Sequence, residues 1–411
     1  MPSSSDRIRI LFVSDAFPAT AAEGGYHGGG WISSLIPLAQ EAGFDIALAG
    51  LSTFPLPRES RLAKWGRYLR GRERDYSVLD GPVREFIRQV KPDLIYLFGI
   101  ESSLCGSVLN GAGDIPVAVH LQGLLTAVEK AYYPPGFSAK TFSGRFSVRE
   151  TLLHNGFGYA YRVLVRLAER EPELIKRVSN FLGRTDFDRS VVQHYHPEAR
   201  YFTVNEVLRE PFYAYAGAVS YTNKPVFGIC SILSGTAYKG LDVVLKTARL
   251  LRESGFPPFV WRIAGIGSDD PIIGFFERAT GVRSGEVGIR YDGTRTAEQL
   301  CDDLLGADVY VHPSYIDNSP NSVCEAQMLG VPVVATRVGG LESLVRDEET
   351  GLLIPSNGIQ ELAEALRRLQ DDTSLRERLG KAGAAAAAVR HDKAAVREQL
   401  ETAVKTILNH E

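Results

Sequence analysis

Two acidic residues, Asp317 and Glu325, stand with seven residues between them in a stretch that is typical of a loop followed by a helix. Ser319 suits the N-cap of this helix, and Pro320 suits its first position, where the missing N–H of proline costs nothing. A carboxylate accepts hydrogen bonds from both hydroxyls of a vicinal diol, so Glu325 can hold a ribose. The second acid and the N–H groups at the start of the helix can hold a sugar and its phosphates.

The residues after this helix support a binding site over the alternative, which is a pair of solvated acids around an ordinary βα unit. Gly330 to Val333 has the pattern G-x-P-V, and Val331 to Ala335 is apolar enough for a buried parallel strand. Gly339 and Gly340 then open a loop that ends near Glu342. This combination is far more specific than a single glycine-rich match.

The elements that must position these acids belong to a regular α/β pattern. From Pro225 onward, apolar strands alternate with helices, which predicts a parallel sheet with right-handed crossovers. Ser231 ends the first strand of this series, and Lys239 stands at the entry to the helix that follows. Gly265 and Gly293 follow the next two strands.

The N-terminal half has the same character. A strand over residues 8–14 is followed by a glycine-rich loop that ends at Gly29 and Gly30 and by a helix from Trp31, an arrangement that receives phosphates in Rossmann-like domains. No G-x-G-x-x-G is present, so a dinucleotide is not indicated, and a mobile surface loop remains the alternative.

His120 ends a strand over residues 116–120 and precedes Gly123 closely, which favours a site because ligands bind beyond the carboxyl ends of such strands. A lone histidine is more often a satisfied polar residue. Thr185 and Asp188 have the spacing of a capping box. Arg184 either points toward a site or is a plain surface arginine.

With these residues the chain resembles the retaining GT-B glycosyltransferases of family 4. Those enzymes carry a glutamate, seven residues, a second glutamate, a G-x-P-V strand and a Gly-Gly loop that ends in Glu. Glu325 matches the second glutamate, and Asp317 stands in place of the first. The resemblance implies an α/β protein of two Rossmann-like domains, with parallel sheets that face a cleft and a C-terminal helix that crosses back to the first domain.

The resemblance also assigns site residues. It implies that Asp317, His120 and Lys239 are catalytic, with His120 facing the donor sugar and Lys239 on the donor phosphates. The usual arginine partner is missing between Lys224 and Lys239, and Ser231 lies near its expected place. The implied donor-binding residues are Gly29, Gly30, Ser231, Lys239, Gly265, Gly293, Asp317, Asn318, Ser319, Pro320, Asn321, Ser322, Val323 and Glu325. No DxD-type pair ends a strand, so no metal is expected.

Length and pattern together predict two domains, because 411 residues are too many for one ordinary core. We expect an N-terminal Rossmann-like acceptor domain over 1–208 and an interdomain connection over 209–223. A C-terminal donor domain over 224–388 and a last helix over 389–411, packed on the first domain, complete the expected order.

Composition excludes several classes of protein. The net charge of −3 and a pI near 6.3 give no general affinity for nucleic acid. The cysteines are far apart, without a CxxC pair, and are expected to be reduced thiols of a cytoplasmic protein. No signal peptide and no uninterrupted apolar run of about 18 residues is present, so no membrane-spanning helix is expected.

The stretch from Arg58 to Arg74 holds seven basic residues against two acidic ones. Leu62, Trp65 and Leu69 recur in it at helical spacing, and a basic helix with such a face can lie on an anionic membrane surface. The alternative, which the pattern favours slightly, is a solvated helix whose apolar stripe packs on the core.

The function that we expect is transfer of a sugar, with retention, from a nucleotide-activated donor to a saccharide or lipid-linked saccharide in glycan synthesis. No cofactor is required, and the nucleotide-sugar is a substrate. A nucleotide-sugar epimerase or a phosphorylase on the same fold is one alternative, and a non-catalytic nucleotide-sugar-binding homologue is another. The sequence names neither the base, the sugar, the acceptor nor the oligomeric state.

Overall fold

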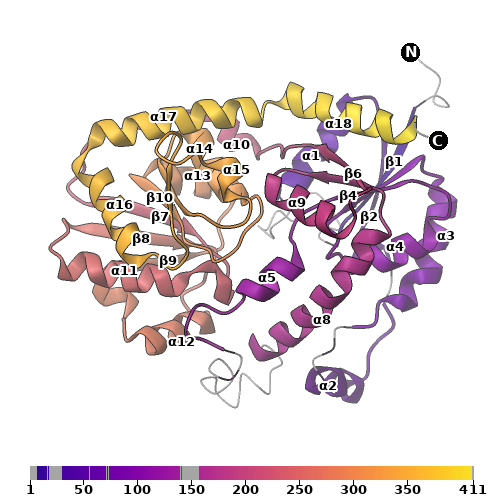
Figure 1. Cartoon of the computed structure of the whole chain (residues 1–411), viewed down its shortest axis with the longest axis horizontal. Helices are drawn as coiled ribbons and strands as arrows, with labels where there is room; N and C mark the ends of the chain where they lie inside the picture. The colour runs from indigo at the N-terminus through magenta and orange to yellow at the C-terminus, as the bar shows by residue number, and fades with distance from the viewer. Residues whose placement is uncertain are drawn as a thin grey trace. The chain divides into compact units, whose positions relative to one another are not determined.

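The chain folds into two compact units (Figure 1). The computed structural model describes residues 7–15, 17, 30–54, 56–70, 72, 74–138, 140 and 157–409. Unit 1 comprises Met1–Glu129, Phe146–Val207 and Asp392–Glu411, and unit 2 comprises Lys130–Arg145 and Leu208–His391.

Unit 1 is built on a parallel sheet of six strands in the order β2-β1-β3-β4-β5-β6. The strands are β1 (Arg9–Val13), β2 (Asp45–Ala49), β3 (Leu94–Phe98), β4 (Val117–His120), β5 (Asn180–Gly183) and β6 (Arg200–Thr203). β3 is buried at every position, as expected for a central parallel strand covered on both faces. The alternation of strands and helices therefore predicted this layer correctly.

Helices connect the strands of unit 1, and the last helix of the chain joins them. They are α1 (Gly30–Glu41), α2 (Arg61–Leu69), α3 (Asp80–Val90), α4 (Cys105–Gly111), α5 (Leu125–Ala131, whose last two residues belong to unit 2), α8 (Phe157–Lys176), α9 (Asp186–Tyr195) and α18 (Lys393–Leu408), with short 3-10 turns η1 (Leu51–Thr53) and η2 (Ser77–Leu79). α9 begins with the predicted capping box of Thr185 and Asp188. α18 packs against α1 and β6, so the predicted return of the C-terminal helix to the first domain is confirmed.

Unit 2 has a second parallel sheet of six strands, in the order β12-β11-β10-β7-β8-β9. The strands are β7 (Phe227–Ile232), β8 (Phe259–Ala264), β9 (Ile289–Gly293), β10 (Val309–His312), β11 (Val333–Thr336) and β12 (Leu352–Ile354). The chain builds outward from β7 to β9, then returns to the other side of β7 with β10. Neighbouring β7 and β10 therefore mark the point where the strand order reverses, which is where open α/β sheets bind ligands.

The helices of unit 2 are α10 (Glu210–Ala214), α11 (Leu241–Glu253), α12 (Pro271–Thr280), α13 (Ala297–Leu305), α14 (Asn321–Leu329), α15 (Leu341–Leu344), α16 (Ile359–Asp371) and α17 (Thr373–Arg390), with 3-10 turns η3 (Ala237–Lys239) and η4 (Ser284–Val287). α14 packs against α10, α13 and α17. Its N-cap is Pro320, not the predicted Ser319, because Pro320 keeps an extended backbone with ψ of 116°.

The short helix α2 lies within the basic stretch of unit 1 and exposes its apolar residues. Leu62 is 86%, Trp65 43% and Leu69 62% exposed, so the prediction that this stripe packs on the core is wrong. Within the part of the chain that the structure describes, no helix combines the length and the apolarity needed to cross a membrane.

Candidate functional site

The residues that follow β7 and β10 meet at the reversal point of the unit 2 sheet. Lys239 ends η3, after β7, and its Nζ lies 2.5 Å from Oδ2 of Asp317, in the loop after β10. Nε2 of His312, the last residue of β10, lies 3.0 Å from the same oxygen. Two predicted catalytic residues, Lys239 and Asp317, are therefore brought together, and His312 is a partner that the sequence analysis did not single out.

Gly240 is needed for the close contact between the turn after η3 and the loop after β10. It has φ of +79°, and a Cβ there would lie 2.2 Å from the carbonyl oxygen of Pro313. Only glycine allows the turn after η3 to lie this close to the loop after β10.

The electrostatics of the cluster fix its charges near neutral pH. Burial raises the pKa of Asp317, but the charge of Lys239 and the hydrogen bond from His312 outweigh burial and hold that pKa well below its usual value. Burial lowers the pKa of His312, so the imidazole is neutral and its Nε2–H donates to the carboxylate. The site thus presents one lysine cation beside one ionised carboxylate.

The loop after β10 is held by the Gly-Gly turn that the sequence analysis identified. The backbone N–H of Gly340 donates to the carbonyl oxygen of Asp317 at 3.0 Å. Gly339 has φ of +54°, and a Cβ there would lie 2.0 Å from the same carbonyl oxygen. The two glycines therefore let the loop after β11 close onto the Asp317 loop.

The start of α14 is linked to the same cluster through its side chains. The Tyr310 hydroxyl donates to Oγ of Ser322 at 2.7 Å and lies 3.3 Å from Nδ1 of His312. The N–H of Asn318 donates to Oδ1 of Asp317 at 3.1 Å. Among the other predicted donor-binding residues here, Ser319 and Val323 are buried, and Pro320 and Asn321 are partly exposed.

Glu325, on the next turn of α14, is paired with a residue that sequence reasoning missed. Nε and Nη2 of Arg209 donate to Oε1 and Oε2 of Glu325, each at 2.8 Å. The Glu325 side chain is 2% and the Arg209 side chain 14% exposed. Arg209 precedes α10 in a segment without periodicity, so no signal in the sequence pointed to it.

Three predicted donor-binding residues of unit 2 serve the sheet itself. The Ser231 hydroxyl donates to the carbonyl oxygen of Val311 at 2.8 Å and accepts from Nε1 of Trp261 at 3.0 Å. The N–H of Gly265 donates to the carbonyl oxygen of Gly293 at 2.7 Å. The structure does not bring these residues to the Lys239 cluster through any described hydrogen bond.

In unit 1, the predicted catalytic His120 is enclosed by aromatic rings. It is fully buried at the end of β4, with its Nδ1 2.7 Å from the Tyr96 hydroxyl and its ring 4.8 Å from that of Trp31. Burial, together with the charge of Arg184, lowers its pKa well below the usual range. Gly30 begins α1, whereas Gly29 lies outside the described residues.

Arg184 is part of the same enclosure. It is 4% exposed, stacks on Trp31 at 4.8 Å from the ring and donates to the carbonyl oxygen of Leu121 at 3.2 Å. The interpretation of Arg184 as a plain surface arginine is therefore wrong.

Unit 1 also has a point where its strand order reverses, between β1 and β3, and two acids follow those strands. Asp15 follows β1 and accepts from Oγ of Ser102 at 2.7 Å. Glu101 follows β3 and accepts from the N–H of Gly123 at 2.9 Å. Burial raises the pKa of Glu101 to about 7, against the effect of its backbone hydrogen bonds. Sequence reasoning did not identify either acid.

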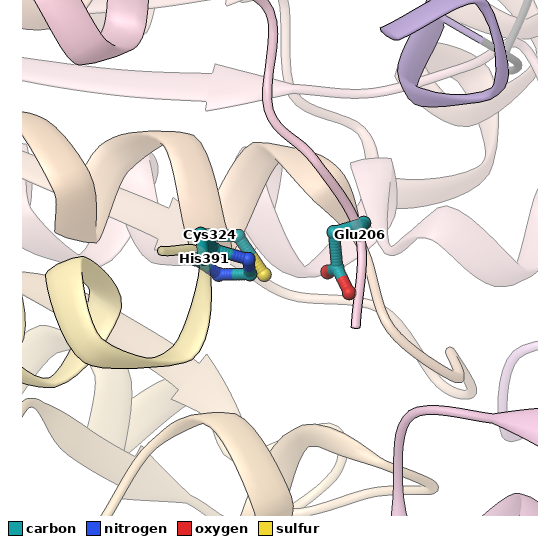
Figure 2. Close-up of side chains that lie close together, drawn as sticks. All are labelled: Glu206, Cys324 and His391. Carbon is teal, nitrogen blue, oxygen red and sulfur yellow. The ribbon is translucent and has the colours of Figure 1, made fainter. Parts of the chain in front are cut away.

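Cys324 lies beside Glu325 on α14, and its thiol is buried. Figure 2 shows its side chain with that of His391, which follows α17, and their ligand atoms lie within 4.8 Å of each other. The third labelled residue, Glu206, belongs to unit 1. One thiolate and one imidazole are only two of the four ligands that a structural zinc ion takes, and we assign no metal to them.

Comparison with known proteins agrees with this geometry. Residues 220–386 match the family model described as glycosyl transferases group 1. A D-inositol 3-phosphate glycosyltransferase of Streptomyces bingchenggensis is 42% identical over 109 residues, which are 26% of this chain and 24% of that protein. The chain thus spans about a quarter of the length of this curated relative.

Solved structures resemble the whole fold. Sucrose-phosphate synthase from Thermosynechococcus elongatus has a TM-score of 0.71 at 16% identity, over 98% of this chain and 100% of that chain. Anabaena HepE, solved in complex with UDP and glucose, has a TM-score of 0.62 at 15% identity, over 97% of this chain and 100% of that chain.

These likenesses define a class. The fold is GT-B, as predicted, and the resemblance to the glycosyltransferases of family 4 is confirmed. The family model covers the unit that carries Lys239, Asp317 and Glu325.

Proposed function

We propose that this chain is a retaining glycosyltransferase that moves a sugar from a nucleotide-activated donor to a saccharide or lipid-linked saccharide. The observation that carries the proposal is the Lys239–Asp317 pair at the reversal point of the unit 2 sheet. This unit also contains the match to glycosyl transferases group 1. The names of two similar proteins support this choice of substrates. One is named a D-inositol 3-phosphate glycosyltransferase, and the other was solved in complex with UDP and glucose.

The chemical demand of such a transfer is to stabilise the nucleoside diphosphate that leaves. A fixed cation and aligned N–H groups meet this demand when they face the place where negative charge develops. Lys239 supplies the cation, and the N–H groups at the start of α14 supply the dipoles. Asp317 orients the Lys239 ammonium and, by the resemblance, accepts a hydroxyl of the donor sugar.

The acceptor side of the proposal rests on unit 1. α2 presents Leu62, Trp65 and Leu69 to solvent in a stretch of net positive charge. A short helix of this kind suits the surface of an anionic membrane. We therefore propose peripheral contact with the cytoplasmic face of a membrane that carries the acceptor.

A product analysis tests the proposed reaction. The protein is incubated with UDP-, GDP-, ADP- and CDP-sugars and membrane extract, and the anomeric configuration of the product is determined by NMR. The proposal expects release of one nucleoside diphosphate with formation of a glycoside of the donor's configuration. Inverted product, epimerised donor without acceptor, or no turnover with any donor would reject it.

A further inference from the structure

His312 is the side chain that links the Asp317 loop to the interior of the unit 2 sheet. It ends β10, a strand that pairs with β7 on one side and with β11 on the other. Tyr310 stands two residues earlier on the same strand, so the two side chains point to the same face of the sheet. His312 is 1% and Tyr310 0% exposed. The backbone of β10 therefore holds the imidazole in a fixed place.

Each ring nitrogen of His312 has a polar neighbour. Nε2 lies 3.0 Å from Oδ2 of Asp317. Nδ1 lies 3.3 Å from the Tyr310 hydroxyl, which in turn lies 2.7 Å from Oγ of Ser322 at the start of α14. Burial lowers the pKa of His312, so the neutral ring carries one proton, and an ionised carboxylate can only accept. The proton is therefore on Nε2 and is donated to Asp317.

The other groups that bind the Asp317 carboxylate are less firmly placed. Among the described residues, Oδ2 also accepts from Nζ of Lys239, and Oδ1 accepts from the N–H of the adjacent Asn318. Lys239 reaches the carboxylate with a long, flexible side chain from the three-residue turn η3. Of these three described donors, His312 alone is carried by a strand. Its place therefore depends neither on the lysine nor on the loop.

We propose that His312 is a positioning residue of the donor site, which holds the Asp317 carboxylate where it directs Lys239 at the donor phosphates. The Tyr310 hydroxyl keeps the ring in the orientation that presents Nε2 to Asp317. This inference rests on the proposed function, because it assumes that Lys239 meets a diphosphate leaving group. A preorganised charge stabilises such a group without rearrangement during the reaction, so a mobile carboxylate would reduce the rate.

Two amide substitutions of His312 distinguish its two nitrogens. The terminal amide of glutamine can take the place of Nε2 and donate an N–H to Asp317, whereas that of the shorter asparagine reaches only to the place of Nδ1. With saturating donor, His312→Gln is expected to keep kcat within about five-fold of the wild type, and His312→Asn to lose about 10- to 100-fold, as for one hydrogen bond to a charged group. Equal kcat values for the two variants would overturn the proposal.

A tyrosine variant and a double variant test how the effect is transmitted. Tyr310→Phe removes one hydroxyl and keeps the ring, and it should lower kcat about three- to ten-fold. Tyr221→Phe, which removes a hydroxyl that donates to the carbonyl oxygen of Gly330 at 2.7 Å, is the matched control and should keep the kcat of the wild type. In an Asp317→Ala background no carboxylate remains to be held, so His312→Asn should change the residual rate less than about two-fold. An additive loss would show that His312 does not act through Asp317.

Comparison with Lys239→Ala separates failure of this inference from failure of the proposed function. If Lys239→Ala loses transfer while His312→Asn keeps it, His312 has no positioning role and the glycosyltransferase proposal stands. If the wild type transfers no sugar from any donor, both are rejected. Melting temperatures show whether each variant folds. If His312→Asn does not fold, equal kcat values for Tyr310→Phe and Tyr221→Phe would overturn the proposal by themselves.

Discussion

Asp317 shows how a single residue is adapted to its place. It is one methylene shorter than the glutamate at this position in the family that the chain resembles. The N–H of the next residue, Asn318, donates to it, and Lys239 approaches from the loop after β7. The Asp317 carboxylate therefore accepts from its own loop, and the Lys239 ammonium lies against it. In the proposed function, Lys239 is the group that meets the phosphates.

Lys239→Ala removes the only cation of the described Lys239–Asp317–His312 cluster. Transfer is expected to fall about 100-fold or more, because the leaving group loses a preorganised charge. Steady-state assays of kcat with a saturating donor give the measurement. Lys381→Ala, which removes an exposed partner of Glu377, is the control and should keep full activity. Turnover of Lys239→Ala near that of the control would remove Lys239 from the site.

The buried Glu101 leads to a prediction about how the stability of the fold depends on pH. Its pKa is about 7 in the folded chain and near 4.5 when unfolded, so the unfolded state releases the proton first as pH rises. The free energy of unfolding therefore falls between about pH 4.5 and pH 7 and shows no further loss from this group above that range. Glu101→Gln removes this dependence.

Melting temperatures measured from pH 4.5 to 8 test the direction of this pH dependence. The melting temperature of Glu101→Gln should rise relative to that of the wild type as the pH increases to about 7, and the difference should then stay constant. Glu349→Gln, whose side chain is 68% exposed, is the control and should track the wild type. A Glu101→Gln curve parallel to the wild type would show that Glu101 ionises as an ordinary carboxyl.

At the scale of helices, strands and loops, the sequence predicted the features that depend on neighbouring residues in the chain. The G-x-P-V strand, the Gly-Gly loop, the capping box of α9 and the alternation of strands and helices all follow from short patterns. The start of α14 was misplaced by one residue, since Pro320 stays extended. Arg209 was missed because its partner is 116 residues away, and no periodicity links residues so far apart. Glu101 was missed because its shifted pKa comes from tertiary burial.

Helix α2 carries the prediction about membranes. Flotation with anionic and with neutral liposomes compares the wild type with a variant in which Arg61, Lys64 and Arg70 are changed to Glu. Each cation near an anionic surface contributes about 1 kcal/mol, so binding to anionic liposomes should weaken at least about 100-fold. Arg67 is kept, because it pairs with Glu59 at 3.0 Å and donates to Tyr159.

The control for α2 changes Lys176, Lys381 and Lys405 to Glu. These side chains are 53%, 69% and 57% exposed, and they lie outside the basic stretch. The control should float with anionic liposomes as the wild type does, and salt should release both. Equal flotation of the α2 variant would leave residues 58–74 as a solvated segment.

At the scale of the whole molecule, the two sheets place their polar residues by the same rule. In each unit the strand order reverses once, between β1 and β3 in unit 1 and between β7 and β10 in unit 2. Asp15 and Glu101 follow the first pair, and Lys239 and Asp317 follow the second. This is the expected position of ligands in open α/β sheets. Strand order depends on tertiary pairing, so the sequence could indicate the class of fold but not which loops become neighbours.

The central claim is that unit 2 binds the diphosphate of a nucleotide-sugar with protein groups alone. Calorimetric titration of the wild type with UDP, GDP, ADP and CDP in the presence of EDTA tests it most directly. Lys239 and the N-terminus of α14 supply the positive charge, so one of the four diphosphates is expected to bind without a metal and more tightly than its monophosphate. Binding of none of them, or binding only after magnesium or manganese is restored, would contradict the account.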